Sequence, residues 1–480
     1  MANYFGIDFG TTNSAVVVIP EIEEERYDEI KIGEDKRPLP SFVAINKETG
    51  AVSTGRMAKV ELSGTEEYYL FPSIKTIIGE DMSWKIAGKT WTPVDIAAEL
   101  FKSLKSNALT RTDMDMDRAV VAVPIGFSSK KKNALRRAAK LAGITITMFI
   151  SEPTSAYCSR IQEMQRYKNV AVFDWGGGTL DVVILQVENG IIRELATCGM
   201  SSAGDDIDRK IAEKVCLKAA KKRGMDYTFE DLDPKYRQRL LNACERTKCD
   251  LADEDIAIVS LARLDEDGKL GRIRQEITYD YFSLLIENNV ENAISCLEKA
   301  MRDAGLNAES LDCVLCEGGS SRLRPLQERL ESIFDRDQLI FPRTAMWDIA
   351  SGAAEIACHP GCYTLSRPIG IMLSNDQFYP LMQVGQKLPT IEKTETFSTT
   401  DSDEEAKFIF TDSDDPGKQS FSELFPVPVR GCIDEVLKVT CFVDADMVFK
   451  AKISSNKTRD GWFRVWTYPN LKLSFRPDVN

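Results

Sequence analysis

Two turns rich in glycine and threonine contain the residues best suited to bind phosphate. The first lies in residues 6–14, GIDFGTTNS, and the second in residues 172–182, VFDWGGGTLDV. Each has an apolar strand-like segment, an aspartate at its end, a tight turn and a second apolar segment. Glycines let backbone N–H groups approach phosphate oxygens, and threonine hydroxyls add donors. One such turn is weak evidence, but two matching copies predict a pair of phosphate-binding β-hairpins.

The aspartate at the mouth of each hairpin indicates a metal ion. Asp8 and Asp174 offer carboxylate oxygens, which Mg²⁺ prefers, and Mg²⁺ keeps several of its waters when it binds protein. The two aspartates are therefore predicted to hold a hydrated Mg²⁺ between the hairpins. Neither turn is a P-loop, because neither contains Gly-Lys-Ser/Thr and a strand follows each. His359 is the only histidine, which nearly excludes a histidine base or a multi-histidine metal site.

Two further glycine turns accompany the hairpins. Residues 317–322, EGGSSR, follow the apolar run 311–316 and precede a helix that Pro325 is predicted to start. A glycine pair at such a strand-to-helix turn suits close approach to a nucleoside or phosphate. Residues 203–208, AGDDID, place acids at a predicted helix N-terminus. Either turn alone would be unremarkable.

The first 360 or so residues alternate strand and helix patterns, which indicates an α/β domain. The strands are predicted at 4–7, 15–19, 119–123, 170–173, 180–187 and 311–316, and the helices at 94–106, 205–223, 236–251, 283–304 and 347–357. From residue 369 short alternating runs dominate, including 439–443, 447–453 and 471–475. They predict a β-rich, sandwich-like module.

Composition limits the possible partners and location. Lys plus Arg total 61 and Asp plus Glu total 74, a net charge of −13 over 480 residues. This balance argues against a general nucleic-acid or anionic-membrane binder. No apolar run is long enough to span a membrane, nothing at the N-terminus resembles a signal peptide, and the 12 cysteines are scattered, so a cytoplasmic location is expected. Cys358, His359 and Cys362 lack a fourth ligand and fit ordinary thiols better than a zinc site.

The four glycine sites, in this order, resemble those of the heat-shock protein 70 (DnaK-type) chaperones of the actin-like ATPase superfamily. The resemblance covers nearly the whole chain. Further matching signatures lie at 74–79, 123–124, 151–154, 243–248, 368–371, 388–390, 396–399, 430–431 and 443–446. The implied fold is an α/β actin-like (ribonuclease H-like) two-lobed ATPase domain followed by a β-sandwich peptide-binding domain. The domains would be residues 1–362 for the ATPase, 363–368 for the linker and 369–480 for the sandwich, without the helical lid that normally follows.

The resemblance also implies a Mg-ATP site between two lobes. Asp8 and Asp174 would orient Mg²⁺ through water, and Lys75 would act at the γ-phosphate, where charge shifts during transfer. Glu152, Asp174 and Thr179 would position the attacking water. ATP or ADP contacts are implied for Gly10, Thr11, Thr12, Asn13, Gly176, Gly177, Gly178, Thr179, Gly204, Glu245, Lys248, Gly318, Gly319, Ser320, Arg322 and Asp348. K⁺ is a further candidate cofactor.

Some of these residues also have plainer interpretations. On local sequence alone, Lys75 fits a surface lysine, and Glu152 fits an acid at a helix N-terminus ahead of a proline. By resemblance, Phe378, Phe397 and Thr400 lie where the family builds its peptide groove. The alternative is that the two phenylalanines belong to the sandwich core.

The chain departs from the family at several positions. Cys249 and Ala252 replace residues that often contact the purine, and the usual apolar, acidic linker is absent. Thr147 and Met148 stand where a basic pair usually helps dock J-domain cochaperones, so weak J-domain docking is expected. Pro124 is retained at a switching position, but residues 130–132 are all lysine.

The first prediction is an ATP-dependent molecular chaperone that hydrolyses Mg-ATP and binds extended apolar segments of unfolded polypeptide. A nucleotide exchange factor is an expected partner; nucleic acid and membrane are not. The alternative is a nucleotide-dependent scaffold or regulatory protein of the same family without general chaperone activity, which the missing lid and basic pair favour. A small-molecule kinase of the same superfamily is weaker, because the C-terminal sandwich would have no role in it.

Overall fold

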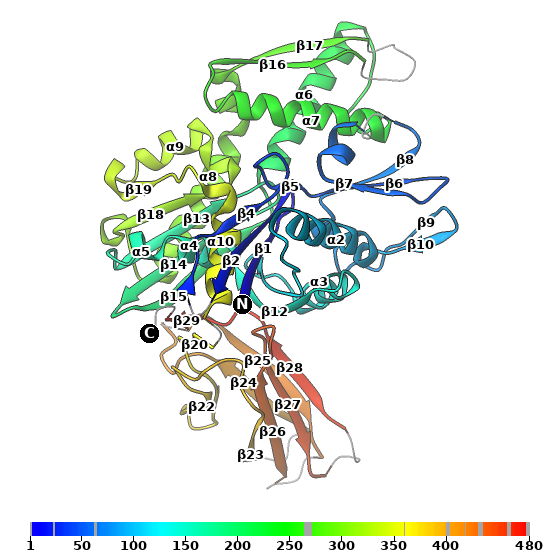
Figure 1. Cartoon of the computed structure of the whole chain (residues 1–480). Helices are drawn as coiled ribbons and strands as arrows, with labels where there is room; N and C mark the ends of the chain where they lie inside the picture. The colour runs from blue at the N-terminus through cyan, green and yellow to red at the C-terminus, as the bar shows by residue number, and fades with distance from the viewer. Residues whose placement is uncertain are drawn as a thin grey trace. The chain divides into compact units, whose positions relative to one another are not determined.

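A computed structural model describes residues 2–22, 25–61, 65–263, 271–359, 361–399, 404–417, 419–430, 435–457 and 462–476 (Figure 1). The chain forms two compact units. The first comprises Met1–Ile125, Lys130–Val183 and Thr197–Cys358, and the second Gly126–Ser129, Ile184–Ala196 and His359–Asn480.

One sheet of the first unit carries the first predicted hairpin. Its strand order is β12-β11-β1-β2-β3, and β4 and β5 also pair with β2. β1 pairs antiparallel with β2, placing Asp8 opposite Ala15, and runs parallel to β11. The strands are β1 (Ala2–Phe9), β2 (Asn13–Ile22), β3 (Glu25–Arg26), β4 (Ile30–Ile32), β5 (Leu39–Pro40), β11 (Arg118–Val123) and β12 (Thr145–Ser151). Apolar side chains such as Ile7 and Val17 are fully buried, which explains why this hairpin is so apolar.

A second sheet carries the second hairpin. Within the first unit its order is β19-β18-β13-β14, with β15 beside β14. β13 runs parallel to β18 in a register that pairs Asp174 with Glu317. The strands are β13 (Asn169–Trp175), β14 (Leu180–Glu188), β15 (Ile191–Met200), β18 (Cys313–Glu317) and β19 (Leu339–Ile340). The strand predictions in this part of the chain are therefore confirmed, with boundaries shifted by a few residues.

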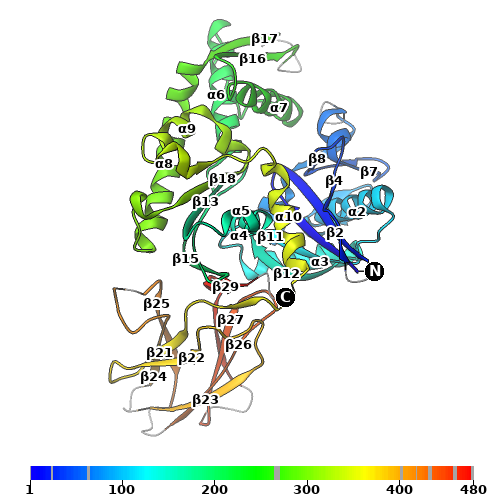
Figure 2. The same ribbon diagram turned by 60° about the vertical axis from the view of Figure 1, so that its left-hand side comes forward.

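The predicted helices of the first unit are also confirmed. They are α2 (Pro93–Thr112), α6 (Gly204–Lys222), α7 (Pro234–Asp250), α8 (Tyr279–Asp303), α9 (Arg324–Glu331) and α10 (Ala345–Ala357). Thr92 and Asp95 form a capping box at the start of α2, and Pro325 lies in the first turn of α9. The arrangement of these helices around the sheets is visible in Figure 2.

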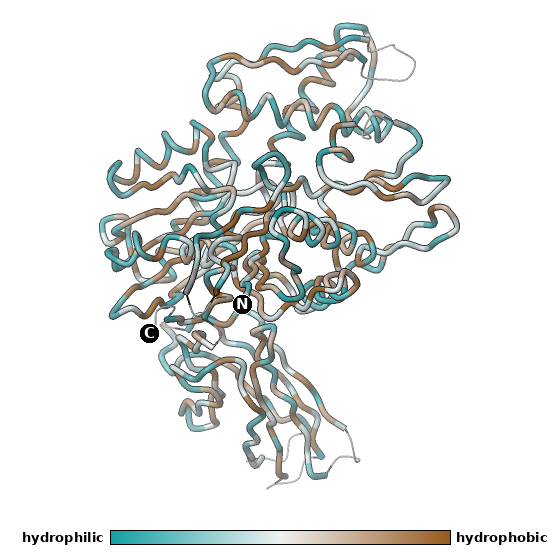
Figure 3. The backbone as a smooth tube through the Cα atoms, viewed as in Figure 1, coloured by the Kyte–Doolittle hydropathy of each residue, from teal (hydrophilic) through white to brown (hydrophobic). Residues whose placement is uncertain are grey.

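Apart from a helix start at Glu152, the remaining elements of the first unit were not predicted. They are β6 (Phe42–Asn46), β7 (Val52–Thr54), β8 (Tyr68–Pro72), β9 (Trp84–Ile86), β10 (Lys89–Trp91), β16 (Ile256–Leu261), β17 (Ile273–Thr278), α1 (Ile74–Ile77), α3 (Ser129–Leu141), α4 (Glu152–Ser159), α5 (Ile161–Met164) and the short helices η1 (Met57–Glu61), η2 (Ala308–Ser310), η3 (Gly319–Arg322) and η4 (Arg336–Gln338). Most are too short to show a clear hydrophobic period. Apolar stretches follow the central strands of the unit in Figure 3.

The second unit is built mainly of two four-stranded antiparallel sheets. Their orders are β22-β21-β24-β25 and β23-β26-β27-β28. The strands are β21 (Ile369–Met372), β22 (Phe378–Met382), β23 (Lys393–Ser398), β24 (Glu405–Thr411), β25 (Ser422–Pro428), β26 (Val436–Val443), β27 (Phe449–Ser455) and β28 (Arg464–Tyr468). Phe410 of one sheet stacks on Trp466 of the other, with ring centroids 3.9 Å apart. The two sheets therefore pack face to face, as the alternating runs predicted.

One strand of this unit lies elsewhere than predicted. The run at 471–475 was assigned to the sandwich, but only Leu473–Phe475 forms a strand, β29, which pairs with β20 (Tyr363–Leu365). β29 also pairs with Ile192 and Arg193 of β15. Alternation alone predicts a strand but not its neighbour, and this explains the error. In the described part of the chain, no helix has both the length and the apolar character needed to cross a membrane.

Candidate active site

The turns of the two predicted phosphate hairpins lie against each other. A Cβ atom built on Gly177 would lie 2.0 Å from Thr12 Oγ1, and one on Gly178 would lie 2.7 Å from Thr11 Oγ1. Only glycine allows this approach. Thr12 Oγ1 is buried and has no hydrogen-bond partner in the structure. An orphaned buried hydroxyl is costly, and an incoming phosphate oxygen would satisfy it.

The first hairpin is held by a residue that the sequence did not single out. Ser41 donates its hydroxyl to the carbonyl of Gly10 (2.7 Å) and its N–H to the carbonyl of Thr12 (2.9 Å). The Ser41 hydroxyl also lies 2.8 Å from that of Ser14. These bonds fix the turn that presents Thr11 and Thr12. No local sequence pattern marks Ser41, because it lies 31 residues after Gly10 in the chain.

The second hairpin collects the other two glycine sites. The carbonyl of Gly176 accepts hydrogen bonds from the N–H of Gly204 (3.2 Å) and from the hydroxyl of Ser320 (2.8 Å). The N–H of Asp205 bonds to the carbonyl of Gly177 (2.8 Å), so the start of α6 is fixed to the turn. Gly318 has a φ of +78°, and a Cβ there would lie 2.7 Å from Asp174 Oδ1. Three of the four glycine sites thus meet beside Asp174.

Four carboxylates gather beside the hairpins: Glu152, Asp174 and Asp181 are buried, and Asp8 is half-buried. Lys75 Nζ lies 2.5 Å from Glu152 Oε1, and both side chains are buried. Burial, followed by the charge of Glu152, raises the pKa of Asp8 to about 7, although Lys75 opposes this. Burial and the neighbouring carboxylates of Glu152, Asp181 and Asp8 raise the pKa of Asp174 well above its ordinary value. One ammonium does not balance four carboxylates, so the cluster favours an added cation.

Mg²⁺ fits this donor set. Asp8 and Asp174 provide the oxygen ligands that a hard cation takes, and a divalent charge would offset the burial of both. Across the described ranges no group of three or more His, Cys, Asp or Glu side chains is placed to hold a metal directly.

The Lys75 ammonium lies among these carboxylates. Burial lowers its pKa, but the charges of Glu152 and Asp8 more than offset the burial, so the pKa lies above its ordinary value. Lys75 therefore stays protonated, and it is no surface lysine, with a side chain only 4% exposed. Glu152 is the first residue of α4, as the helix-terminus interpretation predicted, and it also pairs with Lys75.

Asp181 is a site residue that the sequence analysis missed. Burial and the charge of Glu152 raise its pKa to about 7, while hydrogen bonds from the Thr179 hydroxyl and the Ile125 N–H oppose this rise. The Ile125 N–H lies 2.8 Å from Asp181 Oδ1. The signal was available, because Asp181 follows Thr179 by two residues, at the start of β14.

The predicted purine-side residues have protein partners in this structure. Lys248 Nζ donates to Asp208 Oδ2 (2.8 Å) and to the carbonyl of Gly204 (3.0 Å). Glu245 on α7 pairs with Lys59 on η1 at 2.7 Å. Lys248 lies at the edge of the hairpin site, because it binds the carbonyl of Gly204. Glu245 lies close to it, one helical turn earlier on α7.

Arg322 and Asp348, two other residues predicted to contact the nucleotide, also have protein partners. Arg322 donates to the carbonyl of Pro342 at 3.2 Å. Asp348 is buried on α10, where Arg160 Nε binds it at 3.1 Å. Asp348 also lies beside Glu317, whose pKa is raised well above its ordinary value by burial and by the Asp348 charge. Asp348 thus belongs to a buried polar cluster rather than to an open surface.

A family model described as "Hsp70 protein" matches residues 81–359, which is more than half of the chain. The chain belongs to the Hsp70 family.

Membership of the Hsp70 family implies an actin-like ATPase fold. Proteins of this family generally use ATP or ADP together with Mg²⁺. The Hsp70 match includes the second hairpin, Glu152 and the start of α6. The first hairpin and Lys75 lie before residue 81, outside the matched range. Their assignment to the same site depends on the observed contacts of Thr11 and Thr12 with the second hairpin and of Lys75 with Glu152.

Changing one hairpin glycine of this Hsp70-family site should weaken ATP binding. In Gly177→Ala, the added methyl group would lie 2.0 Å from Thr12 Oγ1, so the hairpins must move apart. We expect at least a ~10-fold loss of ATP affinity in calorimetry, about 1.4 kcal/mol. Gly88→Ala, in the turn between β9 and β10, is the control for a glycine change away from the hairpins, because its Cβ would have no neighbour within 4 Å. Equal losses of ATP affinity in both single variants would contradict the steric argument.

Proposed function

We propose that the chain hydrolyses ATP at the meeting of its two glycine hairpins. The observation that carries this proposal is the contact of Thr11 and Thr12 with Gly178 and Gly177, directly beside a buried carboxylate cluster. Hairpin donors would hold the phosphates, and the carboxylates would hold the metal. The two sheets that contribute the hairpins would form the two lobes of the ATPase domain, with the nucleotide between them.

The residues have separable roles in this proposal. Mg²⁺, when bound, would screen the phosphate charge and orient the phosphates for in-line transfer. Lys75 would place its ammonium at the charge that develops on the γ-phosphate, with Glu152 fixing its position. Glu152, Asp174 and Thr179 would orient the attacking water. We add Asp181 as a positioning residue, because it accepts the hydrogen bond of Thr179.

The same proposal assigns residues 1–362 to the ATPase domain, 363–368 to the linker and 369–480 to a peptide-binding sandwich. Within the proposed linker, Tyr363–Leu365 forms β20. The nucleotide state would shift the affinity of the sandwich for extended apolar peptides, through different lobe arrangements in ATP and ADP. A nucleotide exchange factor would act on the ATPase domain.

An apolar row on the outer face of one sandwich sheet is the best candidate for the peptide site. The strand register places Met372 next to Phe378 and Ile409, and Ile409 next to Leu424. Ile409 alternates with the buried Phe408 and Phe410, so the row faces away from the core. Ile409 and Leu424 are 37% and 55% exposed. A contiguous exposed apolar row suits an extended apolar segment.

The residues expected to form the groove separate into different environments. Phe378 is half-buried and lies over Gly370, on the outer face. Phe397 packs edge-on against Phe408, with centroids 6.1 Å apart, so its ring belongs to the core side. Thr400 lies outside the described residues. We therefore retain Phe378 in the proposed groove and assign Phe397 to the sandwich core.

Replacing Phe378 should weaken peptide binding without unfolding the sandwich. In Phe378→Ala, an apolar peptide loses one contact on an outer face, and the melting temperature should stay within a few degrees. We expect release of a labelled apolar peptide in stopped flow to become at least ~10-fold faster, because related complexes differ mostly in dissociation rate. Phe410→Ala is the control, since it removes a fully buried ring and should cost about 3–5 kcal/mol of stability. A stability loss in Phe378→Ala matching that control would assign Phe378 to the core instead.

A nucleotide-dependent scaffold remains the second candidate. It is favoured by Thr147 and Met148, which stand where basic J-domain contacts are expected. Steady-state ATP turnover with and without an unfolded apolar peptide separates the two candidates. We expect the peptide to stimulate turnover several-fold. Turnover that is indifferent to peptide would favour the scaffold, and absence of any ATP turnover would overturn the proposed function.

A further inference from the structure

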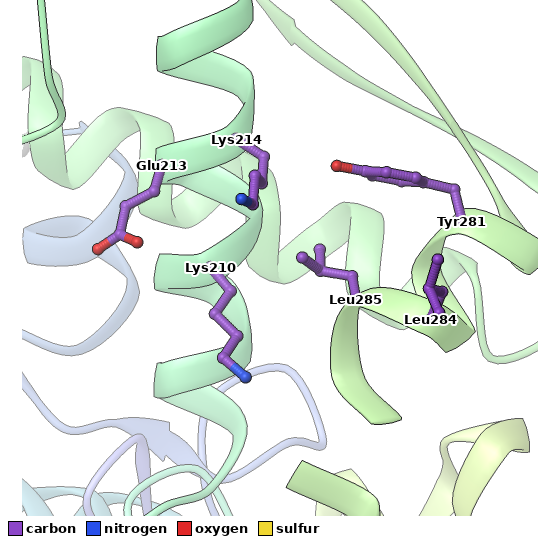
Figure 4. Close-up of a pocket in the computed structure, with 6 residues that line it drawn as sticks. All are labelled: Lys210, Glu213, Lys214, Tyr281, Leu284 and Leu285. Carbon is purple, nitrogen blue, oxygen red and sulfur yellow. The ribbon is translucent and has the colours of Figure 1, made fainter. Parts of the chain in front are cut away.

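A hollow on the first unit lies between α6 and α8, away from the residues of the proposed site. Its volume is about 480 Å³. One wall comes from α6 and the other from the first turns of α8 (Figure 4). The lining residues are Lys210, Glu213, Lys214, Tyr281, Leu284 and Leu285. A volume of this size is within the range of specific binding sites.

The α6 wall is positively charged. The Glu213 carboxylate accepts a hydrogen bond from Arg209 Nε at 2.9 Å, and it points away from α8 in Figure 4. Lys210 donates to the neutral amide oxygen of Asn289 at 2.6 Å. Lys214 is exposed and, within the described ranges, has no carboxylate partner. Lys210 and Lys214 thus line the hollow, and neither has a carboxylate partner among the described residues, while the one carboxylate of the hollow is already paired.

The α8 wall is apolar and open to solvent. Leu284 is 70% exposed and Tyr281 is 45% exposed, and the two lie three residues apart on one helix face. Exposed large apolar residues that line a hollow, rather than standing singly, are typical of interaction sites. The combination of an apolar wall and a basic wall selects a ligand that is both apolar and acidic.

We propose that this hollow docks an acidic peptide segment of a partner protein. An apolar side chain of that segment would pack against Leu284 and Leu285, and its flanking carboxylates would pair with Lys210 and Lys214. A segment of this kind fits better than a small inorganic anion, which would leave the apolar wall exposed to water. It also fits better than an all-apolar peptide, which would bury the ammonium groups without partners.

The hollow is linked by hydrogen bonds to the second glycine hairpin. Lys210 bonds to the buried Asn289, and Asn289 Nδ2 donates to Ser202 Oγ at 3.4 Å. The carbonyl of Ser202 accepts from Trp175 Nε1 at 3.4 Å, and Trp175 immediately precedes Gly176. Docking that recruits Lys210 would disturb this chain of contacts and so change ADP release. This second step rests on the proposed function, whereas docking itself does not.

Binding can be measured without any nucleotide, using the full 480-residue chain. The probe is a fluorescein-labelled, amidated hexapeptide, Asp-Glu-Leu-Phe-Asp-Glu, followed by anisotropy at 0.15 M salt, where the chain's net negative charge is largely screened. We expect saturable binding that Lys214→Glu and Leu284→Ser each weaken at least ~10-fold. Lys222→Glu, an equal charge change near the far end of α6, should alter binding less than ~2-fold. The neutral peptide Asn-Gln-Leu-Phe-Asn-Gln should bind at least ~10-fold more weakly.

Several results would overturn the proposal. They are absent saturable binding to the unchanged chain, equal binding of the neutral peptide, and equal effects of Lys214→Glu and Lys222→Glu. Displacement of the probe by citrate at matched ionic strength would indicate a small-anion site instead. Concentration-dependent dimers that Lys214→Glu abolishes would assign the hollow to a second copy of the chain. Melting curves verify that the exposed-residue variants are folded, and Lys214→Gln provides a milder version if Lys214→Glu is not.

The coupling step has its own readout. With a fluorescent ADP analogue bound, saturating probe peptide should change the release rate at least ~3-fold, and Lys214→Glu should abolish the change. An unchanged release rate with intact peptide binding would remove the coupling and leave the docking site. Failure of the analogue to bind at all would instead count against the proposed function.

Discussion

Asp174→Asn should lower ATP turnover at least ~100-fold while leaving the fold intact. Asp174 is one of two carboxylates proposed to orient Mg²⁺, and loss of a metal-orienting group in phosphoryl transfer removes stabilisation of the transition state. Burial and nearby carboxylates raise the pKa of Asp174 well above its ordinary value, so its ionised form is unfavourable in the folded chain. Its neutral replacement should therefore not lower the melting temperature. Steady-state phosphate release and thermal melting check both statements.

Two comparison variants make this result specific. Asp337→Asn removes an exposed aspartate and should change neither turnover nor melting. Asp8→Asn should resemble Asp174→Asn, and the double variant should lose little more than either single variant, because both residues serve one ion. Near-normal turnover in Asp174→Asn would reject the metal assignment. Additive losses in the double variant would mean that the two aspartates act independently.

Lys75→Met should lower kcat at least ~100-fold and change ATP affinity less than ~10-fold. The ammonium is proposed to act on charge that develops only in the transition state. Removing one such group typically lowers kcat by roughly 10²–10³-fold. The structure adds a second effect. Lys75 and Glu152 form a buried ion pair, so removing one partner should destabilise the fold by about 3–5 kcal/mol.

A double variant separates these two effects. Lys75→Met with Glu152→Gln removes both partners of the buried ion pair, so it should recover most of the lost stability while turnover stays low. Lys85→Met changes an exposed lysine and serves as the surface control. Calorimetry gives ATP affinity, and single-turnover hydrolysis gives the chemical rate. Lost ATP binding with unchanged turnover at saturation would reverse the assignment of Lys75 to the chemical step.

The sequence predicts those parts of the site whose residues lie close together in the chain. Each phosphate hairpin is a continuous segment of strand, turn and strand, so its glycines, threonines and aspartate are visible together. Gly204 and Ser320 were recognised for the same reason, as residues at the start of a helix and at a strand-to-helix turn. The structure then brings both to the carbonyl of Gly176.

The residues that sequence missed act across the fold. Ser41 binds Gly10 from a different strand region, and Lys59 reaches Glu245 from a segment far away in the chain. Neither has a local pattern, since a single serine or lysine is uninformative until tertiary packing places it. The β29 error has the same origin, because alternation marks Leu473–Phe475 as a strand but does not identify Tyr363–Leu365 as its partner.

The buried carboxylates near the hairpins could not be predicted from the sequence. Asp181 lies within the second hairpin segment, residues 172–182, and Glu317 begins the glycine turn 317–322, yet the environment of each depends on burial. Asp181 lies beside Thr179 and Ile125, and Glu317 is fully buried in register with Asp174. Only the folded structure shows that each carboxylate is surrounded by others.

We propose that ATP binding at the glycine hairpins controls peptide binding by the sandwich. The most direct test is the dissociation rate of a labelled extended apolar peptide in ATP and in ADP, measured by stopped flow on the full chain. We expect release at least ~10-fold faster in ATP than in ADP, and we expect Gly177→Ala, which binds ATP weakly, to reduce that difference. Equal release rates in ATP and ADP, with both nucleotides shown by calorimetry to be bound, would contradict the account.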